Sequence, residues 1–299
     1  MFSTTPQLRC STLNLELDRP RVMGIVNLTP DSFSDGGQLA DVDAALAHAR
    51  RLVEQGADLL DLGAESSRPG AEAVSAEQEL ARLMPVLERV LAEFALPVSV
   101  DTAKPEVMRA AIAAGAHMIN DIRALREPGA LEAVADSGVA VCLMHMQGEP
   151  RTMQADPQYD DVLADVHRFL AERIFACEMS GIDKRRILVD PGFGFGKTLQ
   201  HNYQLLGGFA RFSDLGVATL AGVSRKSMIG AMTDKPVEQR VYGSLAAALI
   251  AVQQGAQLIR VHDVAATVDA LKVWAAAAPH IKKAEGKPAA ATVVWPDED

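Results

Sequence analysis

Polar side chains follow nearly every short apolar run of this chain. For any single position, a loop or helix-cap role is the commoner explanation. Eight such positions at one end of a fold instead indicate a site that binds a ligand. In chain order they are Asn27; Glu65, Ser66, Ser67 and Arg68; Asp101; Asn120 and Asp121; His145; Asp190; Ser224, Arg225, Lys226 and Ser227; and Arg260 with His262.

These side chains divide into two chemical sets. The ring set comprises Asp101, Asn120, Asp190 and Lys226. Carboxylates accept paired N–H bonds, and an amide and an ammonium add complementary groups, which suits a flat heterocycle with amino and oxo substituents. The anion set comprises Asn27, Arg68, Arg260 and His262. Its arginines can bind phosphate oxygens in pairs.

The overall charge excludes several classes of partner. The 299 residues include 29 basic and 39 acidic side chains, for a net charge of −10. Nucleic acids and anionic membranes require a basic face, so neither is expected as a partner. Any anion must instead be bound by a local cluster, which the anion set could supply.

The same composition indicates a cytoplasmic protein. No apolar stretch approaches the roughly 18 residues of a membrane span, and the amino terminus lacks the pattern of a secretory signal. The odd number of cysteines, Cys10, Cys142 and Cys177, in no metal-binding pattern, is typical of reduced thiols in the cytosol.

The elements that must position these residues alternate between short apolar runs and longer helical stretches. Most runs are apolar throughout, as in parallel strands covered on both faces. We predict strands at 22–27, 59–63, 98–101, 118–121, 139–144, 187–190, 217–223 and 258–262, with helices between them at 42–55, 76–93, 106–114, 159–179 and 238–253.

Eight strand–helix units favour a (β/α)8 TIM barrel of the α/β class, which commonly forms one domain of about 250 residues. Active sites of such barrels lie at the carboxyl ends of the strands. We therefore predict one domain over residues 1–299. In it, 1–20 form an extension with a hairpin at the bottom of the barrel, 21–280 form the barrel and 281–299 form a flexible tail.

Three other motifs fail on inspection. Gly196, Lys197 and Thr198 resemble the end of a P-loop, but Pro191 stands where its first glycine is required. Lys197 also replaces the last glycine of a dinucleotide fingerprint. A zinc site at His145 and His262 lacks a clustered third ligand.

At these residues the sequence closely resembles the dihydropteroate synthases, over about residues 20–275 and in the family's order. No other family combines these segments. They are MGIVNLTPDSFSDG at 23–36, DLGAESSRPG at 61–70, VDT at 100–102, IND at 119–121, MHMQG at 144–148, DPGFGFGK at 190–197, GVSRKSMIG at 222–230 and RVH at 260–262.

The resemblance implies a transferase that condenses 6-hydroxymethyl-7,8-dihydropterin diphosphate with p-aminobenzoate. The products are 7,8-dihydropteroate and pyrophosphate, Mg²⁺ is the cofactor, and sulfonamides compete with p-aminobenzoate. It further implies a homodimer, formed through the late helices at 238–253 and 265–278. Their Ala-rich faces could equally pack on the barrel.

The resemblance also implies a role for each matching residue. Asp101, Asp190, Lys226, Arg260 and His262 would be catalytic. Ser67 stands where many relatives carry Thr, and the hydroxyl survives. The pterin would contact Asp101, Asn120, Met144, Asp190, Phe195, Gly222 and Lys226; the diphosphate Asn27, Arg68, Arg260 and His262; p-aminobenzoate Phe33, Ser67, Pro69, Ser224 and Ser227; and Mg²⁺ Asn27.

The groups present favour a dissociative mechanism, because the ring nitrogens can delocalise the cation left when diphosphate departs. No serine or cysteine nucleophile with an adjacent base is visible. We expect the loops at 29–38 and 64–74 to close over the substrates and exclude water.

Two alternatives remain open. A pterin-binding methyltransferase on the same barrel would share the ring contacts but has no need for the anion set. A catalytically silent paralogue would be expected to lose loop or anion residues, none of which is missing here.

Overall fold

The computed structural model describes residues 6–29, 37–66, 70, 71 and 73–281. Eight parallel strands form a closed barrel in the order β10-β3-β4-β5-β6-β7-β8-β9, which confirms the predicted TIM barrel. The strands are β3 (Arg21–Asn27), β4 (Leu59–Gly63), β5 (Val98–Asp101), β6 (Met118–Asp121), β7 (Ala140–Met144), β8 (Ile187–Asp190), β9 (Ala218–Ala221) and β10 (Leu258–Val261).

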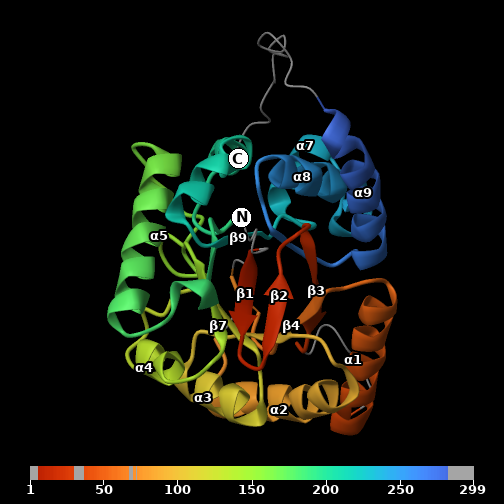
Figure 1. Cartoon of the computed structure of the whole chain (residues 1–299), viewed down its shortest axis with the longest axis vertical. Coiled ribbons are helices and arrows are strands. Elements are labelled where there is room, and N and C mark those ends of the chain that lie inside the picture. Colours follow the sequence, from red (N-terminus) through yellow and green to blue (C-terminus); the bar gives the residue numbers. More distant parts are fainter. Residues whose placement is uncertain (1–5, 30–36, 67–69, 72, 282–299) are drawn as a thin grey trace, which may run out of the picture.

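Helices surround the barrel on its outside (Figure 1). No helix within the described ranges is long and apolar enough to cross a membrane. The helices are α1 (Gly37–Glu54), α2 (Ala76–Glu93), α3 (Pro105–Ala114), α4 (Ala130–Ala135), α5 (Val162–Met179), α6 (Leu199–Gly207), α7 (Ser227–Thr233), α8 (Val241–Gln253) and α9 (Val264–Ala277), with short 3-10 turns that include η2 (Lys184–Arg186) and η4 (Val237–Gln239).

Three helix boundaries differ from those that periodicity predicted. The predicted helix at 159–179 begins only at Val162, because the Asp161 side chain accepts hydrogen bonds from Leu163 N and Ala164 N. The predicted helix at 238–253 is split, since η4 precedes α8. α1 already begins at Gly37, so the first loop ends earlier than expected.

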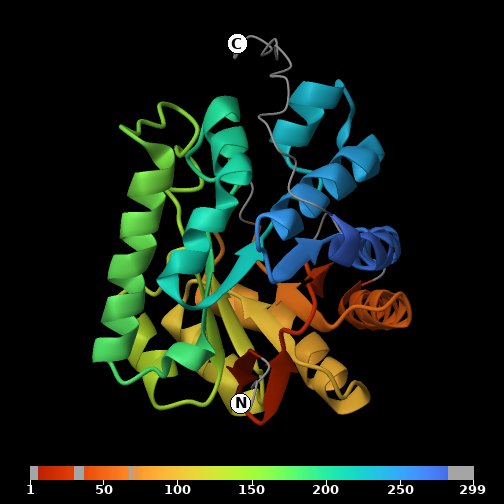
Figure 2. The same ribbon diagram turned by 45° about the horizontal axis from the view of Figure 1, so that its top comes forward.

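A hairpin of β1 (Gln7–Cys10) and β2 (Leu13–Glu16) closes the amino end of the barrel, as expected. Leu8 and Leu15 are buried against the inward side chains Met23, Leu59 and Leu258. Burying one such leucine contributes roughly 1.5–3 kcal/mol. Figure 2 shows the hairpin at one end of the strands. The barrel interior is therefore closed at its amino end by apolar packing.

Candidate active site

Side-chain alternation places a polar layer inside the barrel, above this apolar plug. Val98 and Val100 of β5 pack outward against the helices, so Ser99 and Asp101 point inward. The same parity turns Asn120, Asp190 and Arg260 inward, because Met118, Leu188 and Leu258, two residues earlier, all belong to the inner cluster. The carboxyl ends of the strands thus carry the polar groups, where barrel enzymes build their sites.

One pocket at this end gathers most of the predicted site residues. It also includes Ile25 and Ile122, which the sequence analysis did not single out. Asn27 lies at the end of β3 and Ser227 begins α7, but neither lines this pocket. The predicted residues that line it are Asp101, Asn120, Met144, Asp190, Phe195, Gly222, Ser224, Lys226, Arg260 and His262.

Four predicted site residues lie outside the described residues. They are Phe33 on the first loop and Ser67, Arg68 and Pro69 on the second. The proposed closure of the loops at 29–38 and 64–74 involves residues 30–36, 67–69 and 72, which lie outside the described residues.

Asp61 accepts hydrogen bonds from two side chains that line the pocket, and the sequence analysis did not single it out. Its side chain is fully buried on β4. Asp61 Oδ2 accepts from Arg260 Nε at 2.6 Å and from Asn120 Nδ2 at 3.2 Å. Asp61 Oδ1 has no hydrogen-bond partner in the part of the chain that the structure describes. A charged residue inside an apolar strand was the available signal.

Arg260 joins the ring set to the anion set. Besides Asp61, its guanidinium donates to Asp101 Oδ2 from Nη2 at 3.0 Å. Burial opposes the charged form of Arg260, but Asp61 and Asp101 outweigh it and raise the pKa. The two sets, separate in the sequence argument, therefore form one charged network.

Burial moves the pKa values of the ring set toward neutrality. It raises the pKa of Asp101 to about 7, against the opposing effect of Arg260 and with the help of Asp61. Burial also raises the pKa of Asp190, although Lys226 and the Gly192 N–H favour its ionised form. For Lys226, burial lowers the pKa to about 8, against the effect of Asp190. Perturbed groups of opposite charge in one pocket are typical of functional sites.

Lys226 also lies over an aromatic ring. Its Nζ is 4.4 Å from the centre of the Phe195 ring and donates to the carbonyl oxygen of Phe193. An ammonium over a ring face is attracted by the ring's negative electron density. Phe195 and Lys226 therefore pack against each other in the lining of the pocket.

Lys197 holds the loop that carries Phe195. Its buried Nζ lies 2.9 Å from Gly192 O, 3.0 Å from Phe195 O and 2.9 Å from His145 Nδ1. Burial first, and Lys197 second, lower the pKa of His145 to about 2, so this ring stays neutral. Lys197, which in the sequence resembled the lysine of a P-loop, therefore holds this loop through buried hydrogen bonds.

Ser224 and His262 lie side by side at the ends of β9 and β10. Ser224 Oγ accepts from the His262 backbone N–H at 3.2 Å and lies 3.1 Å from His262 Nδ1. A serine predicted to contact p-aminobenzoate therefore contacts a histidine predicted to bind the diphosphate.

Few of the described side chains could bind a metal ion. No group of three or more His, Cys, Asp or Glu side chains with metal-binding geometry occurs within the described ranges. Asn27, at the end of β3, offers a single amide oxygen. These residues fit Mg²⁺ only if a bound ligand and water supply most of its oxygen ligands.

A cavity of about 780 Å³ lies at the opposite end of the barrel. It is lined by the hairpin residues Leu8 and Arg9 and by Lys184 and Arg185 of η2. None of the ring-set or anion-set residues lines it. Because its walls come from the amino ends of the strands, we assign the chemistry to the carboxyl-end pocket instead.

Comparisons with known proteins agree with this assignment. Residues 23–262 match the model of a family described as pterin binding enzyme. The dihydropteroate synthase of Escherichia coli K12 is 54% identical over 260 residues, which cover 87% of this chain and 92% of that protein.

Solved structures are similar along nearly the whole chain. A Xanthomonas albilineans dihydropteroate synthase with 4-aminobenzoic acid has a TM-score of 0.87 and 64% identity, covering 92% of this chain and 99% of that chain. The enzyme of the same organism in complex with 7,8-dihydropteroate has a TM-score of 0.81 and 58% identity, with the same coverage of both chains.

Proposed function

Because the chain belongs to the family of pterin-binding enzymes, we propose that it catalyses the dihydropteroate synthase reaction. It is a transferase that joins p-aminobenzoate to 6-hydroxymethyl-7,8-dihydropterin diphosphate, and it releases pyrophosphate. The observation that carries this proposal is the inward polar layer, in which the ring set adjoins Arg260 of the anion set.

The ring set binds the pterin in this proposal. Asp101 and Asp190 accept N–H bonds from the ring, Asn120 adds an amide, and Lys226 donates to a ring acceptor. Met144, Phe195 and Gly222 frame the slot. A carboxylate that accepts ring N–H bonds also favours the electron-poor ring that forms as the diphosphate leaves.

The anion set stabilises the leaving pyrophosphate. Arg260 and His262 lie in the pocket, and Arg68 would join them from the second loop. Mg²⁺, bound through the diphosphate oxygens and Asn27, would neutralise charge on the leaving group. Because the C–O bond breaks before attack, the dissociative route requires no covalent intermediate on the enzyme.

The arylamine of p-aminobenzoate then attacks the exocyclic carbon and loses a proton. Phe33, Ser67, Pro69, Ser224 and Ser227 surround it in this proposal. Sulfonamides would compete at the same place, because they present a similar arylamine and a similar anionic end.

The assay that tests this function measures pyrophosphate release from purified protein with the pterin diphosphate and Mg²⁺. We expect release that depends on p-aminobenzoate, is competed by a sulfonamide and yields dihydropteroate. Pterin binding without pyrophosphate release would instead favour the silent paralogue. Methyl transfer to a corrinoid protein would favour the methyltransferase.

A homodimer and a cytoplasmic location complete the proposal. Tyr242 and Ile250 of α8 and Val273 of α9 are exposed apolar side chains on adjacent helices. Neighbouring exposed apolar groups of this kind suit a contact between two copies of the chain. Cys10, Cys142 and Cys177 are all buried and reduced, as suits the cytoplasm.

A further inference from the structure

The loop between β8 and α6 holds two charged members of the ring set. The Gly192 backbone N–H donates to Asp190 Oδ1 at 2.7 Å. Lys226 Nζ donates to the carbonyl oxygen of Phe193 and lies 4.4 Å from the centre of the Phe195 ring. The positions of both charged groups in the pocket therefore depend on the conformation of this loop.

A buried lysine of the same loop binds its backbone at two points. Lys197 is only 2% exposed, and its Nζ donates to Gly192 O at 2.9 Å and to Phe195 O at 3.0 Å. One side chain thus connects the residue that binds Asp190 with the residue whose ring contacts Lys226.

Lys197 also ties this loop to the end of β7. An ammonium has three N–H donors and no acceptor, and the third partner of Lys197 is His145 Nδ1 at 2.9 Å. Burial first, and Lys197 second, lower the pKa of His145 to about 2, so the neutral ring can accept at Nδ1. His145 directly follows Met144, which lines the pocket.

The backbone of this loop depends on partners of this kind. The loop forms neither helix nor strand, and at Gly192 and Gly196 it approaches the backbone of 145–147 too closely for a Cβ. Carbonyl groups buried in such a turn need hydrogen-bond donors from outside the regular elements. Lys197 supplies one donor to Gly192 and one to Phe195, so its loss would leave both parts of the turn less firmly held.

Stability alone does not account for a lysine at this position. The three partners of Lys197 are neutral groups, and burying an ammonium without a carboxylate partner is costly. Burial lowers the pKa of Lys197 well below its usual value, against the effect of Asp190. The charge of Lys197 in turn lowers the pKa of Asp190 and so favours the ionised carboxylate in the pocket.

We propose that Lys197 is a positioning residue for the pterin ring, because it fixes the loop that places Asp190, Phe195 and Lys226. The inference rests on the proposed function, which assigns these three residues to the pterin. Lys197 touches no substrate in this account and acts through the backbone of Gly192 and Phe195.

The test is titration calorimetry of the full chain with 6-hydroxymethylpterin, which carries the ring but no diphosphate. We expect Lys197→Met to raise the dissociation constant roughly tenfold or more, because small misplacements of binding groups cost this much. The number of binding sites per folded chain should stay at the wild-type value. A purely structural role would instead lower the number of sites and leave the dissociation constant unchanged.

The matched control is Arg186→Met. Arg186 is also a buried cation that donates to backbone carbonyl groups, those of Val134 and Val139 at 2.8 Å each. It lies in η2, which precedes β8, whereas the loop held by Lys197 follows that strand. Arg186→Met should lower the free energy of unfolding but leave the dissociation constant within about twofold of the wild-type value, since distant sites act independently.

Two outcomes overturn the inference: an unchanged dissociation constant in folded Lys197→Met, or an equal rise in Lys197→Met and Arg186→Met. If Lys197→Met does not fold, Lys197→Gln, which keeps a polar side chain one atom shorter, is judged by the same criterion. Failure of the proposed function is distinct from both, because the wild-type protein itself would then show no turnover that depends on p-aminobenzoate.

Discussion

Arg260 Nε lies 2.6 Å from Asp61 Oδ2 inside the barrel, although 199 residues separate the two in the chain. Asp61 is fully buried on β4, and Arg260 ends its side chain between Asp61 and Asp101. Arg260, which the sequence analysis assigned to the diphosphate, is thus oriented by the carboxylate of Asp61. Orientation before binding reduces the cost of ordering the side chain when a ligand arrives.

Replacing Asp61 by Asn should weaken this orientation while keeping the shape of the side chain. Arg260 would lose one of its two carboxylate partners in a buried setting. We expect a loss of about 3 kcal/mol in the free energy of unfolding, since breaking a buried ion pair leaves a charge poorly compensated. Affinity for the pterin diphosphate should fall roughly tenfold or more. Urea denaturation and titration calorimetry measure the two effects.

Asp43→Asn is the control for this change, because Asp43 forms an exposed ion pair with Arg89. Exposed pairs contribute about 0–1 kcal/mol. Equal effects of the two substitutions on stability and on affinity would contradict a special role for Asp61.

The pH dependence of kcat/KM for the pterin diphosphate should be bell-shaped. Asp101, with a pKa of about 7, must be ionised to accept ring N–H bonds. Lys226, with a pKa of about 8, must be protonated to donate. Activity should therefore rise with pH through about 7 and fall through about 8. A profile measured in constant-ionic-strength buffers checks both limbs.

Lys226→Arg tests whether Lys226 causes the fall in kcat/KM at high pH, because a guanidinium stays charged to far higher pH. The limb should move upward in this variant, even if the rate falls. Lys226 also affects the pH dependence of stability. The pKa of Lys226 is 10.5 in the unfolded chain and about 8 in the folded protein, so the folded protein loses this proton at lower pH. The free energy of unfolding should therefore gain from Lys226 as pH rises through this window. An alkaline limb that does not move would assign it to another group.

Gly192→Ala should be far more damaging than its backbone conformation alone explains. Gly192 has φ +71°, and an added Cβ would lie 1.9 Å from the carbonyl oxygen of His145. Gly181 has φ +84° but nothing within 4 Å of that position. Gly181→Ala should thus cost about 1–2 kcal/mol from the left-handed backbone. Gly192→Ala should cost clearly more in urea denaturation, because backbone must move.

Gly192→Ala should also disturb Phe195, which Lys197 holds in the same loop. Weaker pterin binding is therefore expected in any folded fraction of the variant. Equal unfolding free energies for the two alanine variants would show that the clash is relieved at little cost.

Tyr242→Glu should separate the proposed dimer. Tyr242 is 82% exposed on α8, and Val273 is exposed on the adjacent helix α9. A charge in the centre of an apolar contact would be buried without a partner. Sedimentation velocity should show the wild type as a dimer and the variant as a monomer. Phe175→Glu is the control, because Phe175 is 63% exposed on α5, on the other side of the barrel (Figure 1).

The sequence predicted the barrel and most of the pocket because both depend on short-range rules. Apolar runs covered on both faces, with a polar residue at each carboxyl end, specify parallel strands whose last side chains converge. This rule predicts from the sequence alone that Asp101, Asn120 and Asp190 lie in the pocket. The resemblance to known enzymes then implied a chemical role for each of them.

Local capping set one helix boundary that periodicity alone could not. The side chain of Asp161 competes for the first N–H groups of α5, so the helix starts later than its apolar pattern suggests. The glycines at 192, 194 and 196 resembled a nucleotide motif, but at Gly192 and Gly196 the chain approaches the backbone of 145–147 too closely for a Cβ.

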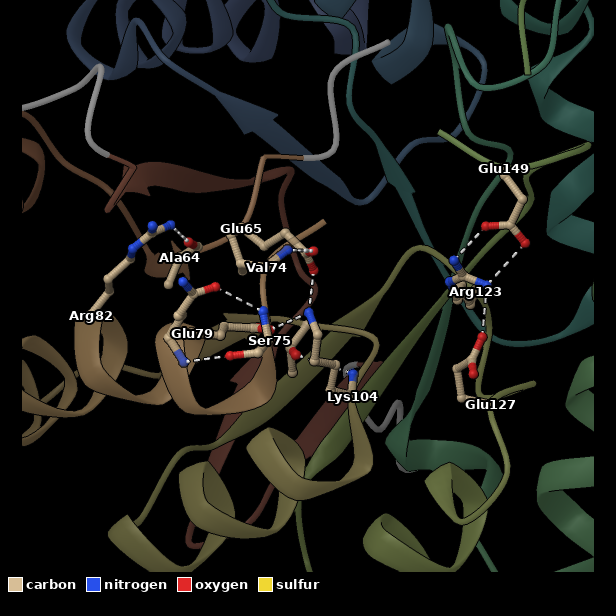
Figure 3. Close-up of polar contacts among 12 residues, drawn as sticks. Ala64, Glu65, Val74, Ser75, Glu79, Arg82, Lys104, Arg123, Glu127 and Glu149 are labelled. Carbon is tan, nitrogen blue, oxygen red and sulfur yellow. Dashed lines mark hydrogen bonds and ion pairs between the residues drawn. The ribbon is translucent and has the colours of Figure 1, made fainter. Parts of the chain in front are cut away.

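Only the tertiary structure decided which charges meet. Asp61 is a single carboxylate in an apolar run, and nothing near it in sequence names Arg260 as its partner. Lys104 Nζ likewise donates to Glu79 Oε2 at 2.7 Å (Figure 3), although 25 positions separate the two residues in the chain. Sequence determines which residues each strand turns inward, because side-chain parity is local. Pairing inside the barrel depends on strand order and register, which arise only when all eight strands close.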